Sequence, residues 1–442
     1  MDFGEDAQLI SQARGGDAYA MAVLGANYRR GEGMIRDSEK ARIWLERAAS
    51  KDHPVGLYNL AILYREGHVV PRDLAKADEL MTRALGGLKR LSEEEDPRAW
   101  ANLGYLYEIG WILPPDRKLA FEYYQKAAEA GFARAQNNLG LIYQYGEPAQ
   151  LELAAHWYQK SANQGFARGQ ANLAQLYDLG YGLPRDLGEA LRWYELAAKR
   201  GSAMAQNRLG SLYETGEGYD RDYHAAFKWY RRAADDQFAP AMINLGRLYE
   251  QGKGVPKDPN TAFFWYLKSI GAEPELGKQR INRLLEDLAE HKKHLDLRGS
   301  KLAGLSLKGI NFSGADLSGA DLAGADLSWA QFVGAKLIRA NLVGADLSFA
   351  LLRRTDLTDA NLSRANLNDA QMMSANLTRA NLKEASLKST ALVGANLTQA
   401  NLFGIDAARV NLEGANLSGA HEVPRLWKDH LGSDGIYRAG TP

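Results

Sequence analysis

The sequence predicts two solenoids in succession, the first built of paired α-helices and the second of a much shorter repeating unit. Through the longer first part of the chain, a Leu-Gly or Leu-Ala pair returns at intervals of 34 to 43 positions. From Leu297 to Leu417, one five-residue rule holds for 25 consecutive steps. No stretch rich in Gly, Ser or Pro separates the two regions, so we expect a rigid junction between them.

The longer repeat is marked by seven pairs of a Leu and a small residue. The pairs are Leu24-Gly25, Leu60-Ala61, Leu103-Gly104, Leu139-Gly140, Leu173-Ala174, Leu209-Gly210 and Leu245-Gly246. A Tyr stands three residues after each pair, and a turn and a second apolar stretch containing Trp or Tyr usually follow. Because apolar residues recur at helical spacing in both stretches, each repeat is predicted to be a pair of amphipathic helices. The small residue would let the partner helix approach closely, and the Trp or Tyr would fill the wider gap.

These residues resemble Sel1-like repeats, a branch of the tetratricopeptide-type α-solenoids. The resemblance implies an α-solenoid of about seven repeats over residues 1–273. The second repeat departs from the pattern, because Asp78 or Glu79 stands where Trp is expected and Arg83 to Glu95 is an insertion. We therefore expect a local irregularity or a longer exposed helix near residues 85–96.

The shorter repeat places Leu, Phe or Met at every fifth position, with Ala407 as the exception, and a small residue two positions earlier. Asp or Asn usually stands between them. A period of five is neither that of a helix nor that of a strand, so it predicts a solenoid whose units bury their apolar residue only by stacking. The pattern resembles the pentapeptide-repeat family, which implies a right-handed quadrilateral parallel β-helix in which residues four pentads apart stack. Its interior would leave no room for a ligand.

Together these features predict an α+β multidomain repeat protein with four segments. They are the α-solenoid at residues 1–273, a capping or connecting helix at 274–294, the β-helix at 295–420, and a C-terminal cap or tail at 421–442. The connecting helix is expected to cap the α-solenoid and to cover the first coil of the β-helix. Apolar residues in the tail are expected either to plug the last coil or to form a homodimer contact; they are Val423, Leu426, Trp427 and Tyr437.

Composition excludes several classes of function. The 54 basic and 54 acidic residues balance, so no global field favours nucleic acid or an anionic membrane. The absence of Cys excludes disulfides, thiolate metal sites and Cys nucleophiles. No signal peptide and no long apolar run is visible, so a cytoplasmic protein is expected, with leaderless secretion left open.

No motif for catalysis, a metal or a cofactor is recognisable, and no small-molecule substrate is expected. Of the eight His residues, only His291 and His294 could share a helix face, and two Lys between them indicate a solvated cap. The recurrent Gly-x-Gly elements are expected to end helices, because the strand that a phosphate-binding loop requires is missing. An enzyme is therefore not expected.

The residue before the marker Leu is the first candidate for partner binding. It is Asn in five repeats and Arg in another, namely Asn59, Asn102, Asn138, Asn172, Asn244 and Arg208. An amide both donates and accepts hydrogen bonds, so a column of Asn in a solenoid groove suits an extended peptide. The alternative is that each Asn bonds a neighbouring helix and belongs to the fold.

On the second solenoid, Trp329 and Phe349 are separated by four pentads and should stack on adjacent coils, either as a contact surface or as a stabilising ladder.

The sequence thus favours a bacterial-type, non-enzymatic scaffold or adaptor that binds a protein partner. Some pentapeptide-repeat proteins imitate DNA and bind gyrase, and that interaction is one alternative. Residues 296–420 carry 11 acidic and 12 basic side chains, which argues against it, although a local strip of Asp316, Asp321, Asp326 and Asp346 would suit it. An unrecognised hydrolase is the second alternative.

Overall fold

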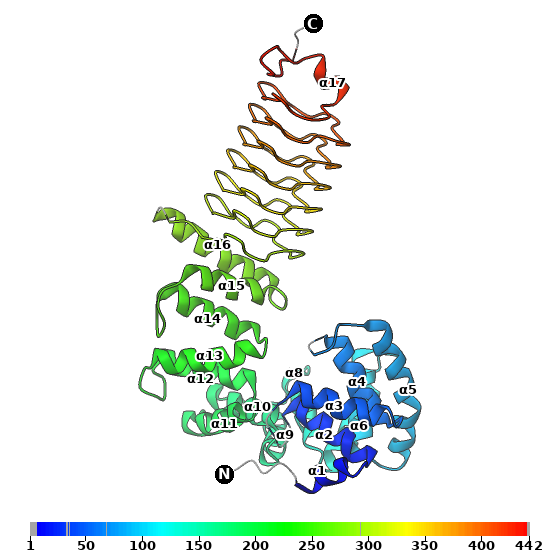
Figure 1. Cartoon of the computed structure of the whole chain (residues 1–442). Helices are drawn as coiled ribbons and strands as arrows, with labels where there is room; N and C mark the ends of the chain where they lie inside the picture. Colours follow the sequence, from blue (N-terminus) through cyan, green and yellow to red (C-terminus); the bar gives the residue numbers. More distant parts are fainter. Residues whose placement is uncertain (1–6, 32–33, 35, 68, 292, 440–442) are drawn as a thin grey trace. The chain divides into compact units, whose positions relative to one another are not determined.

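The computed structural model divides into two compact units, Met1–Met242 and Ile243–Pro442, and each is described by itself (Figure 1). The structure describes residues 7–31, 34, 36–67, 69–291 and 293–439. The division falls inside helix α14 (Ala239–Gln251), within the last of the seven expected helix pairs. The four-segment division of the sequence therefore stays a prediction about the chain and does not coincide with these compact units.

Unit 1 is a succession of antiparallel helix pairs that follows α1 (Ala7–Arg14). The first helices of the pairs are α2 (Ala18–Arg30), α4 (Pro54–Glu66), α6 (Pro97–Ile109), α8 (Ala133–Tyr145), α10 (Ala167–Leu179) and α12 (Ala203–Thr215). The second helices are α3 (Ser38–Ala49), α5 (Leu74–Glu93), α7 (Arg117–Glu129), α9 (Leu151–Asn163), α11 (Leu187–Lys199) and α13 (Tyr223–Asp235). Each first helix packs on the second helix of its own pair and on its neighbours, as a helical solenoid requires.

Local chemistry explains where these helices begin and end. An Asp side chain accepts a hydrogen bond from the backbone at the start of five of the second helices; these residues are Asp37, Asp73, Asp116, Asp186 and Asp222. Most first helices end at a Gly in the left-handed conformation, such as Gly110 with φ 67°. The exception is α8, where Gly146 has φ −70°.

The marker pairs confirm close helix packing, and a Tyr of the partner helix meets two of them. A Cβ added to Gly104 would lie 2.9 Å from the ring of Tyr124, and one added to Gly210 would lie 2.7 Å from that of Tyr230. These Tyr are the second of two adjacent aromatic residues and are fully buried, whereas the first, such as Trp229, is only half-buried. Of the Trp or Tyr expected to fill the gap, the Tyr therefore does so at these two markers, because helical periodicity turns the second residue of the aromatic pair toward the marker.

The insertion in the second repeat lengthens its second helix, as expected. Helix α5 has 20 residues, whereas the other second helices of unit 1 have 12 or 13. Asp78, at a position where Trp was expected, accepts a hydrogen bond of 2.7 Å from Nε1 of the buried Trp111. An aromatic side chain from the next repeat thus occupies this place.

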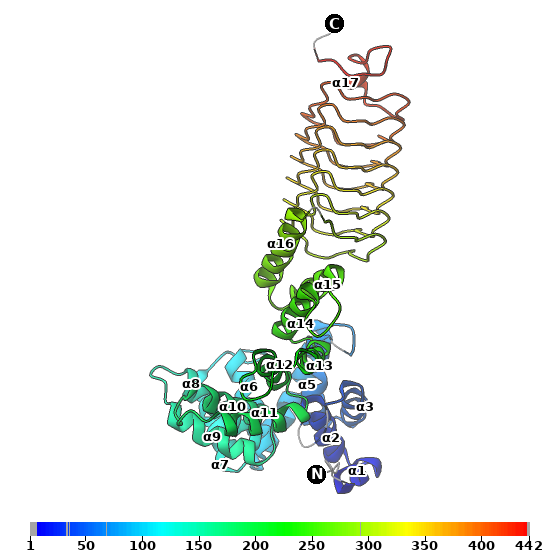
Figure 2. The same ribbon diagram turned by 90° about the vertical axis from the view of Figure 1, so that its left-hand side faces the viewer.

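Unit 2 contains α15 (Pro259–Ser269), α16 (Pro274–Glu290), a stack of short coils, and α17 (Arg425–Lys428) (Figure 2). The apolar face of α16 shares one core with α15 and with the Leu residues of the first coils. The side chain of Asn282 on α16 also accepts a hydrogen bond of 3.2 Å from the backbone N–H of Asn311. Helix α16 therefore covers the open end of the coil stack, as expected of the connecting helix.

The coils of unit 2 repeat after every four pentads. Isolated parallel bridges join each paired residue to the one four pentads later, from Asp296 and Asp316 to Asn401 and His421, and successive bridges are one pentad apart. Each bridge is a single pair, so the described part of these coils contains no extended strand. The reason is that each side of a coil contributes one paired residue before the backbone turns, with residues such as Trp329 at φ 62°.

The interior of the coils is closed by apolar side chains. The central Leu residues have almost no exposed surface, and Phe312 and Phe332 stack with ring centroids 5.2 Å apart. Thr355 and Thr390 replace the usual Ala, and their buried hydroxyl groups donate to backbone carbonyls at 2.7 and 2.8 Å. The interior therefore has no space for a ligand.

The tail covers the last coil. Trp427 on α17 is buried in the core of unit 2. The backbone N–H of Tyr437 donates to the carbonyl of Ala415 at 2.9 Å, and that of Leu417 donates to Gly435 at 2.9 Å. Leu426 stays 83% exposed, so the homodimer contact considered for this tail stays a prediction.

Candidate functional site

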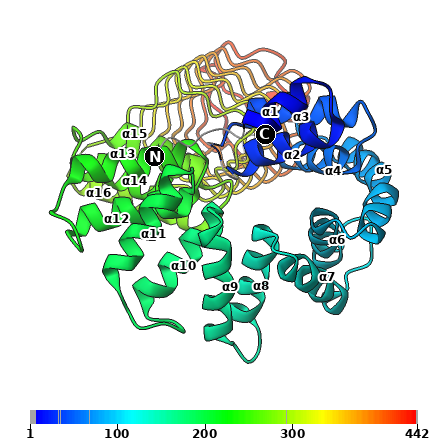
Figure 3. The same cartoon turned by 90° about the horizontal axis from the view of Figure 1, so that it is seen from below.

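A polar groove in unit 1 is lined mainly by the first helices of successive repeats. Figure 3 shows helices α4 to α11 following one another round a curve. Two adjoining cavities, of about 380 and 420 Å³, form the groove. Both are lined by Arg29, Arg30, Arg36, Asn137, Asn138, Leu141 and Arg168. Each cavity has a volume in the range of known binding pockets.

The curvature of unit 1 brings its first repeat close to its fifth and sixth. A Cβ added to Gly31, at the end of α2, would lie 2.7 Å from the carbonyl oxygen of Arg200, which follows α11. Arg36 and Asp236, which follow α2 and α13, form an ion pair at 3.9 Å. Burial raises the pKa of Asp236 above its ordinary value, and the charge of Arg36 opposes this effect. The groove is therefore bordered by residues from distant parts of the chain.

Two of the predicted Asn residues are buried and satisfied inside the protein. Asn59 donates to the carbonyl of Val55 at 2.8 Å and accepts from Arg30 Nη2 at 2.7 Å. Asn102 is 1% exposed and accepts from Nη2 of Arg134. These two side chains do not reach a ligand directly. They hold arginines that line the groove.

Two other predicted Asn residues line the groove themselves. Asn138 borders both cavities, and its side chain forms no hydrogen bond with any residue that the structure describes. Asn172 borders the second cavity and donates to Oδ1 of Asn137 at 2.8 Å. Asn138 therefore keeps its full capacity to donate and accept hydrogen bonds.

The remaining α-solenoid candidates lie outside the groove. Arg208 forms two hydrogen bonds with the buried carboxylate of Asp178, at 2.7 and 3.0 Å. The hydrogen bond that Arg208 donates to Asp178 also raises the pKa of Arg208. Asn244 lies in unit 2, where Arg247 Nη2 donates to its side chain at 3.3 Å. The structure thus brings together four of the six residues, two directly and two through arginines.

Gln side chains near the markers also serve the fold. Gln136, Gln170 and Gln206 are buried, and each donates to a backbone carbonyl of the preceding helix, at 3.1 to 3.2 Å. Each of these bonds joins the first helix of a repeat to the second helix of the preceding repeat, because a buried amide must find a hydrogen-bond partner within the protein.

The arginines of the groove are the feature that sequence reasoning missed. Five arginines and three carboxylates line the two cavities; the carboxylates are Glu66, Glu108 and Asp236. A recurring signal was present, since Arg98, Arg134 and Arg168 each stand five residues before a marker Leu. Arg36 also stands at a recurring position, because an Arg directly precedes the Asp that begins a second helix at Arg72, Arg185 and Arg221 as well.

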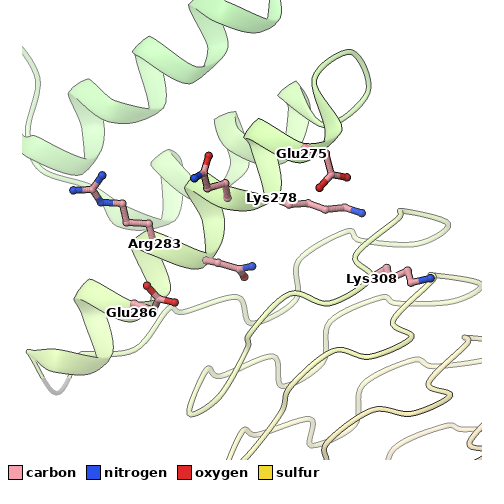
Figure 4. Close-up of a pocket in the computed structure, with 7 residues that line it drawn as sticks. Glu275, Lys278, Arg283, Glu286 and Lys308 are labelled. Carbon is pink, nitrogen blue, oxygen red and sulfur yellow. The ribbon is translucent and has the colours of Figure 1, made fainter.

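A second, wider cleft lies in unit 2 between α16 and the first coils (Figure 4). It has a volume of about 880 Å³ and is lined by Glu275, Lys278, Gln279, Asn282, Arg283, Glu286 and Lys308. Charges of both signs lie along α16, and Lys308 lies across from them on a coil. The cleft has no apolar lining residue, so nothing in it would anchor the apolar part of a ligand.

The exposed surface of the coils carries the aromatic pair predicted from the spacing. The rings of Trp329 and Phe349 stack with centroids 4.5 Å apart and planes 10° from parallel, and they are 55% and 42% exposed. Two pentads away from this pair, on the opposite side of the coils, Arg379 binds Asp359 in a bidentate manner at 2.7 and 2.8 Å.

The acidic strip considered for DNA mimicry is not formed. Asp316, Asp321 and Asp326 belong to consecutive pentads and therefore lie on three different sides of the coil. Only Asp326 and Asp346 are separated by a full coil and paired. Their Oδ1 atoms instead accept hydrogen bonds within the fold, such as the bond of 2.9 Å from the side chain of Asn366 to Asp346.

Comparison with known proteins identifies both repeats. The model of the Sel1 repeat matches seven segments, which are residues 18–53, 54–85, 97–132, 133–166, 167–202, 203–237 and 239–271. These segments cover more than half of the chain. The chain belongs to the Sel1 repeat family. The model of pentapeptide repeats matches eight copies over residues 295–328, 330–369, 340–379 and 380–419, and these repeats imply a β-helix in the C-terminal part.

Solved structures similar to this Sel1 repeat protein include bacterial members of the family. A Sel1 repeat protein from Oxalobacter formigenes is 30% identical, with 62% of this chain and 78% of that chain covered and a TM-score of 0.42. A protective antigen of uropathogenic Escherichia coli is also 30% identical, with 64% and 59% covered and a TM-score of 0.39. A pentapeptide repeat protein from the Arabidopsis thaliana thylakoid lumen is 36% identical, with 22% and 69% covered and a TM-score of 0.22. No curated protein sequence matches the chain.

Sel1 repeats are typical of protein-interaction scaffolds, and both repeat families are typically non-catalytic. No helix in the described part of this Sel1 repeat protein is long and apolar enough to cross a membrane. Among the same residues, no group of three or more His, Asp or Glu is arranged to hold a metal ion.

Proposed function

We propose that this Sel1 repeat protein is a non-enzymatic scaffold or adaptor that binds a partner protein, or an extended peptide of it, in the groove of unit 1. The observation that supports this most strongly is the convergence of first helices from successive repeats on one polar groove. An extended peptide presents backbone N–H and C=O groups, which a side-chain amide can bind from both sides. Asn138 and Asn172 supply such amides inside the groove.

The coil stack would act as a rigid rod or as a second binding surface. We propose a right-handed quadrilateral β-helix for it, since pentapeptide repeats imply a β-helix and four pentads complete each coil. The stacked, exposed rings of Trp329 and Phe349 would form the second surface. Two sites on one chain would raise the effective concentration of one partner near the other. A cytoplasmic location and a homodimer through the C-terminal end belong to the same proposal.

The two alternatives have less support. A gyrase interaction through DNA mimicry needs a strongly acidic face, and the coils carry 11 acidic and 12 basic residues with their Asp on several sides. A hydrolase needs a nucleophile or a metal-bound water beside an acid or base. Neither groove residues nor cleft residues form such a group among the described residues.

Blocking the groove tests the proposal. Asn138→Trp places a large side chain in both cavities without removing a hydrogen bond, and Gln251→Trp, at an exposed position outside the groove, is its matched control. Affinity capture with wild type and variants, followed by binding of the identified partner in purified form, measures the effect. We expect Asn138→Trp alone to lose the partner. Retention of every partner by Asn138→Trp would refute the groove.

The same experiment tests the rod. The double variant Trp329→Ser/Phe349→Ser removes the exposed aromatic pair. If it loses a partner that Asn138→Trp keeps, the coils provide an independent binding surface. If that partner is a topoisomerase, the gyrase alternative replaces the proposed function.

A further inference from the structure

The groove of unit 1 concentrates positive charge in a chain that is neutral overall. Five of its lining residues are arginines, whereas three are carboxylates. We infer that the partner segment bound in this groove is an acidic, extended peptide rich in Asp and Glu, whose carboxylates pair with the groove arginines. This inference rests on the proposed function.

Arg134 is positioned by a neutral group. Its Nη2 donates to the amide oxygen of Asn102, and its Nε is buried without a hydrogen-bond partner. Arg134 forms no ion pair with any residue in the described part of the chain. An amide oxygen orients the guanidinium group but leaves its charge uncompensated. A carboxylate that enters the groove would gain a planar, pre-oriented partner.

Arg29 and Arg36 have carboxylate partners, but these are distant. Arg29 lies 3.5 Å from Glu66, and Arg36 lies 3.9 Å from Asp236. Charge-assisted hydrogen bonds between such groups are usually about 2.7 to 2.9 Å long. Both arginines therefore retain donors for an incoming carboxylate, which can bind at the shorter distance.

Two helix starts add to the positive potential of the groove. Ala167 and Arg168 open α10, and Ser202 and Ala203 lie at the start of α12, and all four line the second cavity. The amino end of a helix carries a partial positive charge because its first N–H groups have no partner within the helix. This charge has the same sign as the arginines, so it favours the same ligand.

An acidic peptide fits the groove better than a nucleic acid does. The carboxylates of Glu66, Glu108 and Asp236 interrupt the basic surface and would repel an unbroken row of phosphates. The amides of Asn138 and Asn172 suit a peptide backbone. A nucleic-acid duplex is much too large to enter cavities of about 380 and 420 Å³. A peptide can place carboxylates at the arginines and uncharged residues beside the groove carboxylates.

Fluorescence anisotropy with the full chain tests this inference. The probe is a labelled peptide of alternating Glu and Ala. The three comparison probes are the same peptide with Gln in place of Glu, the same peptide with Lys in place of Glu, and a labelled oligothymidylate. The test variant is Arg36→Gln/Arg134→Gln. The control is Arg354→Gln/Arg409→Gln, which removes two exposed positive charges from unit 2. Circular dichroism establishes that the variants fold, and Arg168→Gln provides a groove variant at an exposed position.

We expect the Glu peptide to bind, and the Gln and Lys peptides not to bind. Loss of two hydrogen bonds to charged groups should weaken binding about tenfold or more in the test variant, with a smaller loss in Arg168→Gln and little change in the control. Higher ionic strength should weaken the binding of the Glu peptide.

The inference is overturned if the Gln peptide binds as well as the Glu peptide, if the oligothymidylate binds more tightly, or if test and control variants lose affinity equally. These results are separable from the test of the proposed function. If the Glu peptide does not bind but Asn138→Trp still loses its partner, the groove binds proteins without a preference for acidic segments. If the Glu peptide binds through the arginines but Asn138→Trp keeps every partner, the charge preference stands and the scaffold role fails.

Discussion

Asn102→Ala should destabilise unit 1, although its equivalent in the next repeat, Asn138, should tolerate the same change. Asn102 is 1% exposed and accepts the hydrogen bond that holds Arg134, whereas Asn138 forms no hydrogen bond with a described residue. A hydrogen bond to a charged group contributes about 1.5 to 3 kcal/mol, and its loss here also leaves a guanidinium group without its acceptor. We expect a loss of about 2 kcal/mol for Asn102→Ala and less than about 0.5 kcal/mol for Asn138→Ala.

Calorimetry of the full chain measures this difference. For a unit of this size, about 2 kcal/mol corresponds to a decrease in Tm of about 4 to 8 °C, while Asn138→Ala should change Tm by less than about 2 °C. In an Arg134→Met background, Asn102→Ala should cost much less, because its charged partner is already gone. Equal Tm values for the two Ala variants, or an unchanged cost in the Arg134→Met background, would refute the assignment of Asn102 as the residue that holds Arg134.

Three further outcomes test the packing, the caps and the coils. Gly210→Ala should destabilise unit 1 by about 1 to 3 kcal/mol in urea unfolding, because its Cβ would meet a buried Tyr ring at 2.7 Å; an unchanged midpoint would contradict the packing. The hydrogen bond from the backbone N–H of Ala225 lowers the pKa of Asp222, so the carboxylate stabilises the fold above its unfolded pKa of about 3.9, and this contribution is lost as pH falls through the lower folded pKa. The difference in Tm between wild type and Asp222→Ala should therefore shrink from pH 7 to acidic pH, and a constant difference would exclude the ionised cap. A double-mutant cycle of Trp329→Ser and Phe349→Ser should give a coupling energy of about 0.5 to 1.5 kcal/mol in stability, whereas zero coupling would show that the stacked rings do not stabilise the coils.

Strict periodicity made the coils predictable in detail. The spacing of four pentads between Trp329 and Phe349 was sufficient to predict their stacking, which is confirmed at 4.5 Å. The reason is that a solenoid unit contacts only its neighbours, so a position in one coil determines the position one period later. The same rule excludes a continuous acidic strip, because Asp316 and Asp321 are one pentad apart and therefore lie on different sides of the coil.

The α-solenoid was predictable at the level of helices but not at the level of single side chains. Asn59, Asn102 and Asn138 occupy one position of the repeat, yet the first two are buried with arginine partners and the third borders the groove. The difference comes from residues in neighbouring repeats, since Arg30 and Arg134 supply those partners. A single repeat contains no information about such a neighbour.

The sequence by itself determined the two periods, the residues that each unit buries and the families that carry these repeats. Only the tertiary structure decided that Arg36 and Asp236 border one groove, that Asn102 supports an arginine and that Asn138 stays available for a ligand. The physical reason is that curvature accumulates from small rotations between successive repeats. Periodicity predicts that a rotation exists, but the packing of the side chains sets its size and so decides which distant residues meet.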